Sequence, residues 1–354
     1  MLLELGNSDL FCWAWNRIYL KANGRVPCWC NSGEVHTLNN FTLNKDFVAD
    51  IVNGPSMRQM RLMINGVGLP YISECRKCCC LTVQNQSADQ RYLDSETSTE
   101  TKGNASSAIL YMKHVEKVRN WPIGSIDQIS EIQIEPSLPC NLSCPGCPQR
   151  DKEKLLKSEG PPYILDIALF QKMINDSLKH NVTINRIQYC GKGEPTLNKN
   201  LPLMIKYAYD HKIPQSMDTN ATHELKDEYL LLDRINCSID GSDEQSYLTY
   251  RRGGDFQKAI NFMTTAAQVK ASTGSNCQIR WKYILFDTTE DEHKLDKAQE
   301  LAKKIGIDQL DFVITSCGAY DGSVKPTSRF KILDNLRNYI NNNRIFDNTI
   351  ASRS

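Results

Sequence analysis

The sequence predicts an α/β protein in which a partial (β/α)6 barrel follows a small cysteine-rich α+β module. Six short apolar stretches of strand character alternate with helical stretches, which is typical of parallel βαβ units. About 200 residues carry this pattern, whereas a full eight-stranded barrel takes about 250, so a partial barrel fits better. Fourteen cysteines are present, and half of them precede the barrel.

The composition excludes several classes of protein. The net charge is +1, with 40% hydrophobic and 23% charged residues, so no nucleic-acid partner is expected. No apolar run is long enough for a membrane span, and the N-terminal residues show neither a basic region nor a cleavage site. We therefore expect a cytoplasmic protein without a membrane partner, whose cysteines serve metal binding or catalysis rather than disulfides.

The first module is expected to cover residues 1–82. Asn23-Gly24 lies between two strand-like stretches and predicts a β-hairpin of Trp15–Leu20 with Arg25–Trp29. Short helices are expected over Phe47–Val52 and Met57–Ile64. These elements give a thin core, which a metal held by clustered thiols would stabilise.

The remaining chain divides into three segments. Residues 83–125 are expected to form a polar linker that ends with a helix over Ile109–Val118, residues 126–325 the barrel, and residues 326–354 a C-terminal helical tail. Strands are predicted over Glu131–Glu135, Arg186–Cys190, Pro214–Asp218, Arg234–Asp240, Gln278–Phe286 and Gln309–Thr315. Helices are predicted over Ile167–His180, Leu201–His211, Lys226–Leu232, Phe256–Ala271 and Glu292–Ile305.

Three cysteines, Cys140, Cys144 and Cys147, begin five residues after the first predicted strand of the barrel. Catalytic groups in such folds lie at the carboxyl ends of the strands. A structural zinc site would normally add a fourth protein ligand, whereas a [4Fe–4S] cluster on three cysteines keeps one iron open for a cofactor. The spacing alone is compatible with either metal centre.

Further motifs follow the later strands in order. They are Gly191-Lys192-Gly193-Glu194-Pro195, Asp218-Thr219-Asn220, Ser238-Ile239-Asp240-Gly241 and Tyr250-Arg251-Arg252-Gly253-Gly254. With the three-cysteine loop before them, residues 128 to about 320 resemble the radical S-adenosylmethionine (radical SAM) superfamily. One position departs from the pattern, because Gly146 stands where the family usually has an aromatic residue before the third cysteine.

The resemblance implies specific roles for these motifs. Cys140, Cys144 and Cys147 would hold a [4Fe–4S] cluster, whose open iron would chelate the amino and carboxylate groups of S-adenosylmethionine. The cofactor contacts implied are Gly191, Gly193, Glu194 and Pro195 for the methionine amino group, Ser238 and Asp240 for the ribose with Thr219 and Asn220 nearby, and Arg251 or Arg252 for the carboxylate. The reduced cluster would cleave the cofactor to a 5′-deoxyadenosyl radical, which abstracts a hydrogen atom from the substrate.

The N-terminal cysteines have the format of a four-thiolate site, because the predicted hairpin and a Cys-x-x-Cys turn each supply thiols. Spacing alone allows zinc or an iron–sulfur cluster. The segment resembles the SPASM/twitch module of radical SAM enzymes, although that module normally follows the barrel. The resemblance implies one auxiliary [4Fe–4S] cluster on Cys12, Cys28, Cys75 and Cys78, with Cys30 as a substitute for Cys28.

Strand alternation predicts a polar lumen. Arg280 and Lys282 lie on the face opposite Ile279 and Trp281, so we expect them, with Glu135 on the first strand, to contact substrate. The alternative is an internal ion network that only supports the barrel. Cys317 continues the polar parity of the sixth strand and is a candidate hydrogen-atom donor, as is Cys190; an inert buried cysteine is the alternative for both.

These features together predict a radical SAM enzyme of the oxidoreductase or epimerase type that acts on a polar small molecule or sugar-like substrate. A flavodoxin or ferredoxin is the expected electron donor. A peptide-modifying maturase of the kind that processes ribosomal peptides (RiPPs) is the alternative enzyme. A non-catalytic iron–sulfur electron carrier or sensor is the alternative from another class, although such a carrier has no need of a nucleoside site.

Overall fold

The computed structural model describes residues 17–27, 37–64 and 125–353. The chain forms two compact units. The first unit comprises Met1–Leu20, Gly24–Ile132 and Lys172–Asn185, and the second comprises Lys21–Asn23, Gln133–Gln171 and Arg186–Ser354. The predicted linker of residues 83–125 and its helix lie outside the described residues, apart from residue 125.

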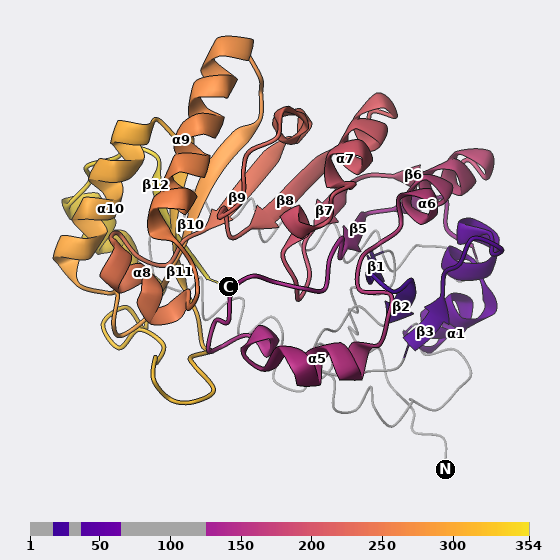
Figure 1. Cartoon of the computed structure of the whole chain (residues 1–354), viewed down its shortest axis with the longest axis horizontal. Coiled ribbons are helices and arrows are strands. Elements are labelled where there is room, and N and C mark those ends of the chain that lie inside the picture. Colours follow the sequence, from indigo (N-terminus) through magenta and orange to yellow (C-terminus); the bar gives the residue numbers. More distant parts are fainter. Residues whose placement is uncertain (1–16, 28–36, 65–124, 354) are drawn as a thin grey trace. The chain divides into compact units, whose positions relative to one another are not determined.

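A parallel sheet forms the centre of the second unit (Figure 1). Its strands follow the order of the sequence: β5 (Glu131–Ile134), β7 (Ile187–Tyr189), β8 (Gln215–Thr219), β9 (Arg234–Ser238), β10 (Gln278–Leu285), β11 (Gln309–Ile314) and β12 (Thr349–Arg353). The pairs from β7 to β12 are all parallel. The predicted parallel α/β fold is therefore confirmed, and all six predicted strands are present.

Helices connect these strands and pack along the sheet, as Figure 1 shows for α7, α9 and α10. The α-helices that belong wholly to this unit are α5 (Lys152–Glu159), α7 (Leu201–Asp210), α8 (Glu244–Tyr250), α9 (Phe256–Thr273), α10 (Glu292–Ile305) and α11 (Leu333–Asn342). Short 3-10 helices cover Pro148–Asp151, Pro195–Leu197 and Asp227–Leu231. The helix expected over Lys226–Leu232 is thus a 3-10 helix.

Local capping explains where the longer helices begin and end. The carboxylates of Asp255 and Asp291 accept backbone hydrogen bonds at the first turns of α9 and α10. Gly274 and Gly306 end these helices in the left-handed conformation, which glycine adopts without steric cost. Among the described residues, no helix has both the length and the apolar character needed to cross a membrane.

The C-terminal segment corrects one prediction. Residues 326–354 were expected to form a helical tail, and α11 lies there. The chain then forms β12, which adds a further parallel strand beside β11, with Leu310 opposite Thr349. This strand is short and lacks a clear apolar alternation, so it gave no recognisable pattern.

Alternation along β10 separates an apolar face from a polar one. Ile279, Trp281 and Tyr283 are fully buried, whereas Arg280 and Lys282 between them are partly exposed. Successive side chains of a strand point to opposite faces, so the apolar set belongs to the core and the polar set lies on the other face. This separation agrees with the parity that the sequence predicts.

The first unit contains short elements. They are β1 (Arg17–Leu20), β2 (Arg25–Pro27), β3 (Thr37–Asn40), a π-helix (Phe47–Val52), α1 (Pro55–Ile64), β4 (Gln128–Ile129) and β6 (Thr183–Ile184), and α6 (Ile167–Lys179) is divided between the units after Gln171. Both predicted short helices are present. The predicted hairpin is wrong, because β2 pairs with β3 and not with β1. The neighbour of β1 is β5, whose first two residues belong to this unit.

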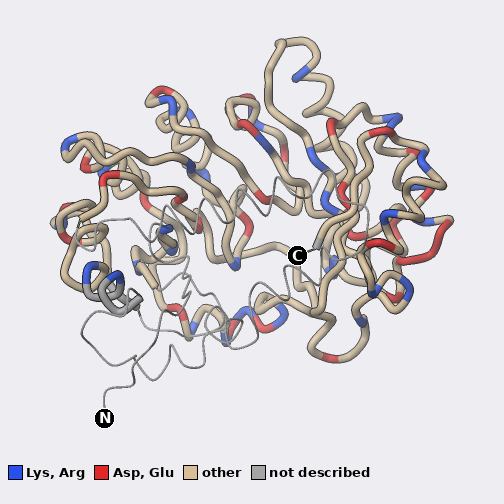
Figure 2. Tube along the Cα trace, turned by 180° about the vertical axis from the view of Figure 1, so that it is seen from behind, with Lys and Arg blue, Asp and Glu red and all other residues tan. Residues whose placement is uncertain are grey.

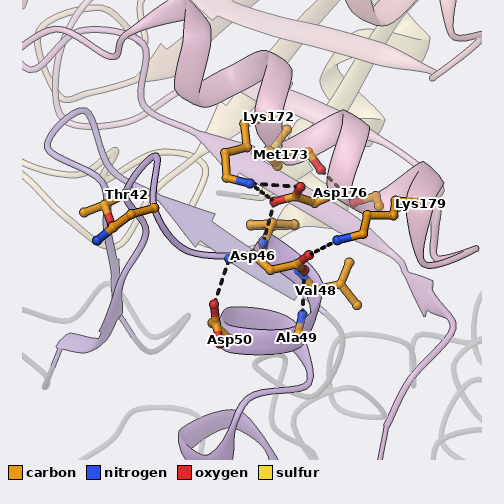
Figure 3. Close-up of polar contacts among 12 residues, drawn as sticks. Thr42, Asp46, Val48, Ala49, Asp50, Lys172, Met173, Asp176 and Lys179 are labelled. Carbon is orange, nitrogen blue, oxygen red and sulfur yellow. Dashed lines mark hydrogen bonds and ion pairs between the residues drawn. The ribbon is translucent and has the colours of Figure 1, made fainter.

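A cluster of ion pairs joins α6 to the π-helix within the first unit (Figure 3). Asp176 accepts a hydrogen bond from the backbone nitrogen of Phe47 at 2.7 Å and pairs with Lys172 at 2.8 Å. Asp46 caps the π-helix and pairs with Lys179 at 3.1 Å. Both signs of charge are interspersed along the described chain (Figure 2), in keeping with its small net charge.

Candidate active site at the strand ends

The three-cysteine loop follows β5 and is held by backbone hydrogen bonds. Cys147 donates its backbone N–H to the carbonyl of Cys144 at 3.0 Å, and Ser143 donates to the carbonyl of Arg252 at 2.9 Å. Cys144 is 7% exposed, whereas Cys140 and Cys147 are partly exposed, and none of the three is in a disulfide. The loop therefore presents three free thiols in one short segment.

The surroundings of these thiols oppose ionisation. Burial raises the pKa of Cys140 to about 11, and the nearby Glu194, Cys144 and Cys147 add to this effect. Burial also raises the pKa of Cys144, although the guanidinium of Arg251 acts in the opposite direction. A bound cation would supply the positive charge that thiolates need here.

The three thiols are chemically suited to an iron–sulfur cluster. Within the described ranges, no three His, Cys, Asp or Glu side chains are grouped closely enough to hold one metal ion. The thiolates of a [4Fe–4S] cluster bind different iron atoms, so they need not converge on one point. The expected cluster ligands, Cys140, Cys144 and Cys147, thus lie together on one loop in a form that such a cluster can use.

The glycine motif after β7 packs directly against this loop. A Cβ atom on Gly193 would lie 2.0 Å from the carbonyl oxygen of Ser137, and one on Gly191 would lie 2.6 Å from the Glu135 carboxylate. Glu194 donates its backbone N–H to the carbonyl of Pro139 at 3.0 Å. The two glycines thus permit close contact between two loops of the chain itself.

Glu135 supports this contact. It is 2% exposed, and its carboxylate accepts a hydrogen bond from the backbone nitrogen of Lys192 at 2.7 Å. The carboxylate therefore lies against the glycine motif and helps to position it, and the expected contact of Glu135 with substrate stays a prediction. Cys190, just before the motif, is bonded through its backbone nitrogen to the carbonyl of Ile134.

Glu194 joins three of the predicted motifs. This carboxylate is 3% exposed and accepts hydrogen bonds from the Thr219 hydroxyl at 2.6 Å and from the Asn220 backbone nitrogen at 2.8 Å. The Asn220 side chain then donates to Asn141 of the cysteine loop at 2.9 Å. Glu194, Thr219 and Asn220 therefore meet beside Cys140, and sequence reasoning missed Asn141 as their partner.

Asp240 and Arg251 form a buried ion pair. Asp240 has no exposed surface, and its two oxygens accept hydrogen bonds from the Arg251 Nε at 2.6 Å and from the Ile284 backbone nitrogen at 2.7 Å. Both oxygens of Asp240 thus have partners inside the protein, and its expected contact with a ribose stays a prediction. Ser238, the last residue of β9, is partly exposed.

Tyr250 explains the unusual glycine at position 146. A Cβ atom on Gly146 would lie 2.7 Å from the Tyr250 hydroxyl oxygen and 2.8 Å from the Gly318 carbonyl oxygen. The Tyr250 ring stacks on Phe286 with ring centroids 4.3 Å apart. An aromatic ring is therefore present at this place, but it comes from α8 rather than from the cysteine loop, and sequence spacing gave no signal of it.

Arg252 lies on the surface near the cysteine loop. It pairs with Asp321 at 2.9 Å and donates to the Ser323 hydroxyl at 2.6 Å. An open pocket of about 670 Å³ lies beside it, lined by Ser143, Arg150, Asp151, Lys152, Glu153, Arg252 and Asp321. Of the two predicted carboxylate-binding arginines, Arg252 is thus the more exposed.

The remaining predicted residues are placed as follows. Cys317 lies beyond the end of β11 and is exposed, next to Gly318, which approaches the cysteine loop. Arg280 and Lys282 lie on the polar face of β10. The proposed ligands of the auxiliary cluster, Cys12, Cys28, Cys30, Cys75 and Cys78, lie outside the described residues.

The fold and site together define a parallel α/β protein in which strand-end loops surround three free thiols. Residues 134–279 match the sequence profile of the Radical SAM superfamily. This segment, which holds the three-cysteine loop and the strand-end motifs, therefore has the features of the radical SAM superfamily that the sequence predicts. The family of this segment implies S-adenosylmethionine and a [4Fe–4S] cluster as cofactors.

Individual curated proteins share only low sequence identity with this chain. The chain is 24% identical over 195 residues to "GTPase Obg" of Brachyspira hyodysenteriae, and 26% identical over 186 residues to "Probable GTP 3',8-cyclase" of Methanococcus maripaludis. Each match covers 51% of this chain, but only 27% and 57% of the respective relatives. The crystal structure of Streptococcus suis SuiB bound to S-adenosylmethionine aligns with 95% of this chain and 71% of its own, at 14% identity and a TM-score of 0.48.

Proposed function

We propose that this chain cleaves S-adenosylmethionine reductively and uses the resulting radical to abstract a hydrogen atom from a polar small molecule or sugar-like substrate. Oxidation or epimerisation would follow. The observation that carries the proposal is the convergence of three motifs, because Glu194 links the glycine loop, the end of β8 and, through Asn220, the cysteine loop.

Cys140, Cys144 and Cys147 would hold the cluster. When bound, the cluster and S-adenosylmethionine supply one-electron reduction and a 5′-deoxyadenosyl radical. The protein positions these groups: Glu194 fixes the glycine loop, and the buried Asp240 fixes the guanidinium of Arg251 beside Cys144.

The cofactor would contact groups around this loop. The backbone of Gly191 to Pro195 faces the same strand ends as Thr219 and Asn220. Ser238 is partly exposed at the end of β9 and remains available for a ribose hydroxyl. Arg252 or Arg251 would pair with the methionine carboxylate, and a guanidinium suits this task because it can donate two parallel hydrogen bonds.

An anaerobic assay tests the proposal. Wild-type protein, reconstituted with iron and sulfide, is incubated with S-adenosylmethionine and dithionite, and 5′-deoxyadenosine is measured. Release is expected for the wild type and for Cys277→Ala, which removes a buried thiol at the far end of β10, and is expected to be lost in Cys144→Ala. No release from the wild type, or equal release from Cys144→Ala, would refute the proposal.

The auxiliary cluster is part of the same proposal. Clustered N-terminal thiols with Cys-x-x-Cys spacing support it. Cys75→Ala or Cys78→Ala should lose about four irons per chain and reduce substrate turnover more than uncoupled cofactor cleavage. A variant that keeps its full iron content and turnover would contradict this assignment.

A further inference from the structure

Polar residues on four neighbouring strands of the second unit, β8 to β11, lie in register on one face of the sheet. Register places Asp218 of β8 beside Asn236 of β9, Asn236 beside Arg280 of β10, and Arg280 beside Gln309 of β11. Residues in register on parallel strands point to the same face. These four residues therefore form one continuous polar row across the sheet.

A second row lies one step closer to the carboxyl ends of the strands. Ser238 is opposite Lys282, and Lys282 is opposite Asp311. Ile239, which directly follows β9, donates its backbone N–H to the Lys282 carbonyl at 3.0 Å. Lys282 is thus level with the strand end at which the ribose contact is proposed.

On β9, β10 and β11 the intervening residues form an apolar face. Ile235, Cys237, Ile279, Trp281, Leu310 and Phe312 are each fully buried. The charged side chains are therefore not required as the hydrophobic support of the sheet, which the opposite face provides. Their position on the other face needs a different explanation.

On strands β8 to β11, the polar face carries one more positive than negative charge. Its cations are Arg234, Arg280 and Lys282, and its carboxylates are Asp218 and Asp311. Asp218 accepts a hydrogen bond from Asn236 at 2.5 Å. Arg280 approaches Asp311 at 3.5 Å, which is long for a charge-assisted hydrogen bond.

Several donors on this face are left without an acceptor among the described residues. The Nε of Arg280 and the Nε2 of Gln309 are buried and make no hydrogen bond there. Lys282 is half-buried and forms no ion pair within 4 Å with any described carboxylate. One acceptor of this face, the Oδ1 of Asp311, is also unpaired within the described part of the chain. Buried donors without partners are unfavourable, especially when charged, so the donors of Arg280 and Gln309 indicate a ligand that accepts from them.

We propose that this polar face binds the anionic group of the substrate, a carboxylate or a phosphate, with Arg280 and Lys282 as its cationic contacts. This inference rests on the proposed function, since it names the substrate class of the same site. The guanidinium of Arg280 can bind either anion with two hydrogen bonds, while Lys282 supplies a point charge from the neighbouring row. Gln309 adds a neutral donor beside Arg280.

The test measures anion binding without S-adenosylmethionine or reductant, so it is independent of cofactor cleavage. Inorganic phosphate and malonate are titrated separately into the reconstituted full-length protein by calorimetry, at ionic strength matched with sodium chloride. Saturable binding of one anion is expected, and the preferred anion distinguishes a phosphate-bearing from a carboxylate-bearing substrate. Lys282→Met and Arg280→Gln should each raise the dissociation constant at least tenfold.

Two variants complete the design. Lys282→Arg keeps the charge and should retain binding, which excludes a loss that merely reflects misfolding. Lys303→Met removes an exposed lysine of α10 and should bind the anion as the wild type does. Absence of saturable binding of both anions to the wild type would overturn the inference, as would equal binding by Lys282→Met; failure of cofactor cleavage alone would refute only the proposed function.

Discussion

Replacing Glu194 by Gln tests how the strand-end motifs are held together. One carboxylate oxygen accepts hydrogen bonds from the Thr196 backbone, the Thr196 hydroxyl and the Thr219 hydroxyl, and the other accepts one from the Asn220 backbone. Glutamine has only one acceptor oxygen, so its amide nitrogen must face a donor. The carboxylate is 3% exposed, and water cannot readily replace the lost contact.

The magnitude follows from these four bonds. One charge-assisted hydrogen bond is lost, which costs about 1.5–3 kcal/mol, and the other three weaken because their acceptor becomes neutral. We expect the free energy of unfolding to fall by about 3 kcal/mol. Urea unfolding of the metal-free protein, followed by circular dichroism, measures this change at pH 7.

A matched control and a local measurement sharpen this experiment. Glu224→Gln removes a carboxylate that is 89% exposed and should change the free energy by less than about 0.5 kcal/mol. Hydrogen exchange of the Asn220 amide should also accelerate in Glu194→Gln, because this N–H loses its acceptor. A variant with wild-type stability and unchanged exchange at Asn220 would refute the assigned role of Glu194.

Two further predictions concern Cys317 and Glu159, whose carboxylate pairs with Lys192 of the glycine motif at 2.5 Å. Burial alone would raise the pKa of Glu159, but hydrogen bonds from Lys192 and Lys21 outweigh it and lower the pKa below its ordinary value of 4.5; its stabilising effect is therefore present above pH 4.5 and lost as the pH falls. Glu159→Gln should lower the free energy of unfolding by about 2 kcal/mol at pH 7 but by little near pH 3. An equal decrease at both pH values, or the same decrease in the exposed Glu153→Gln, would contradict this prediction. If Cys317 donates a hydrogen atom, wild-type product formed in deuterated buffer should contain deuterium that Cys317→Ala product lacks; equal labelling would remove Cys317 from the mechanism.

Local sequence patterns predicted the sheet well because its strands carry strong signals. The alternation in Gln278–Phe286 identifies β10 and both of its faces, and the predicted helix Glu292–Ile305 agrees with α10. The hairpin of β1 and β2 was wrong for the opposite reason. Asn23-Gly24 predicts a turn, but the partner of β1 is β5, more than a hundred residues later, and no local signal reports such pairing.

The candidate site could be predicted only to the level of motifs. Each motif follows a strand, so its place at the sheet edge could be inferred from sequence order. The side-chain partners could not, because they depend on packing between distant loops. The Asp240–Arg251 pair and the contact of Tyr250 with Gly146 join segments whose spacing in the sequence carries no information about their approach.

Metal analysis tests the central claim most directly. The wild type and a variant with Cys140, Cys144 and Cys147 all replaced by Ala are reconstituted anaerobically with iron and sulfide in the presence of equimolar zinc, and bound metals are counted. The triple variant should contain about four fewer irons per chain than the wild type and should lose cleavage of S-adenosylmethionine. Zinc in place of iron in the wild type, or equal iron in both proteins, would contradict the assignment of these cysteines to a [4Fe–4S] cluster.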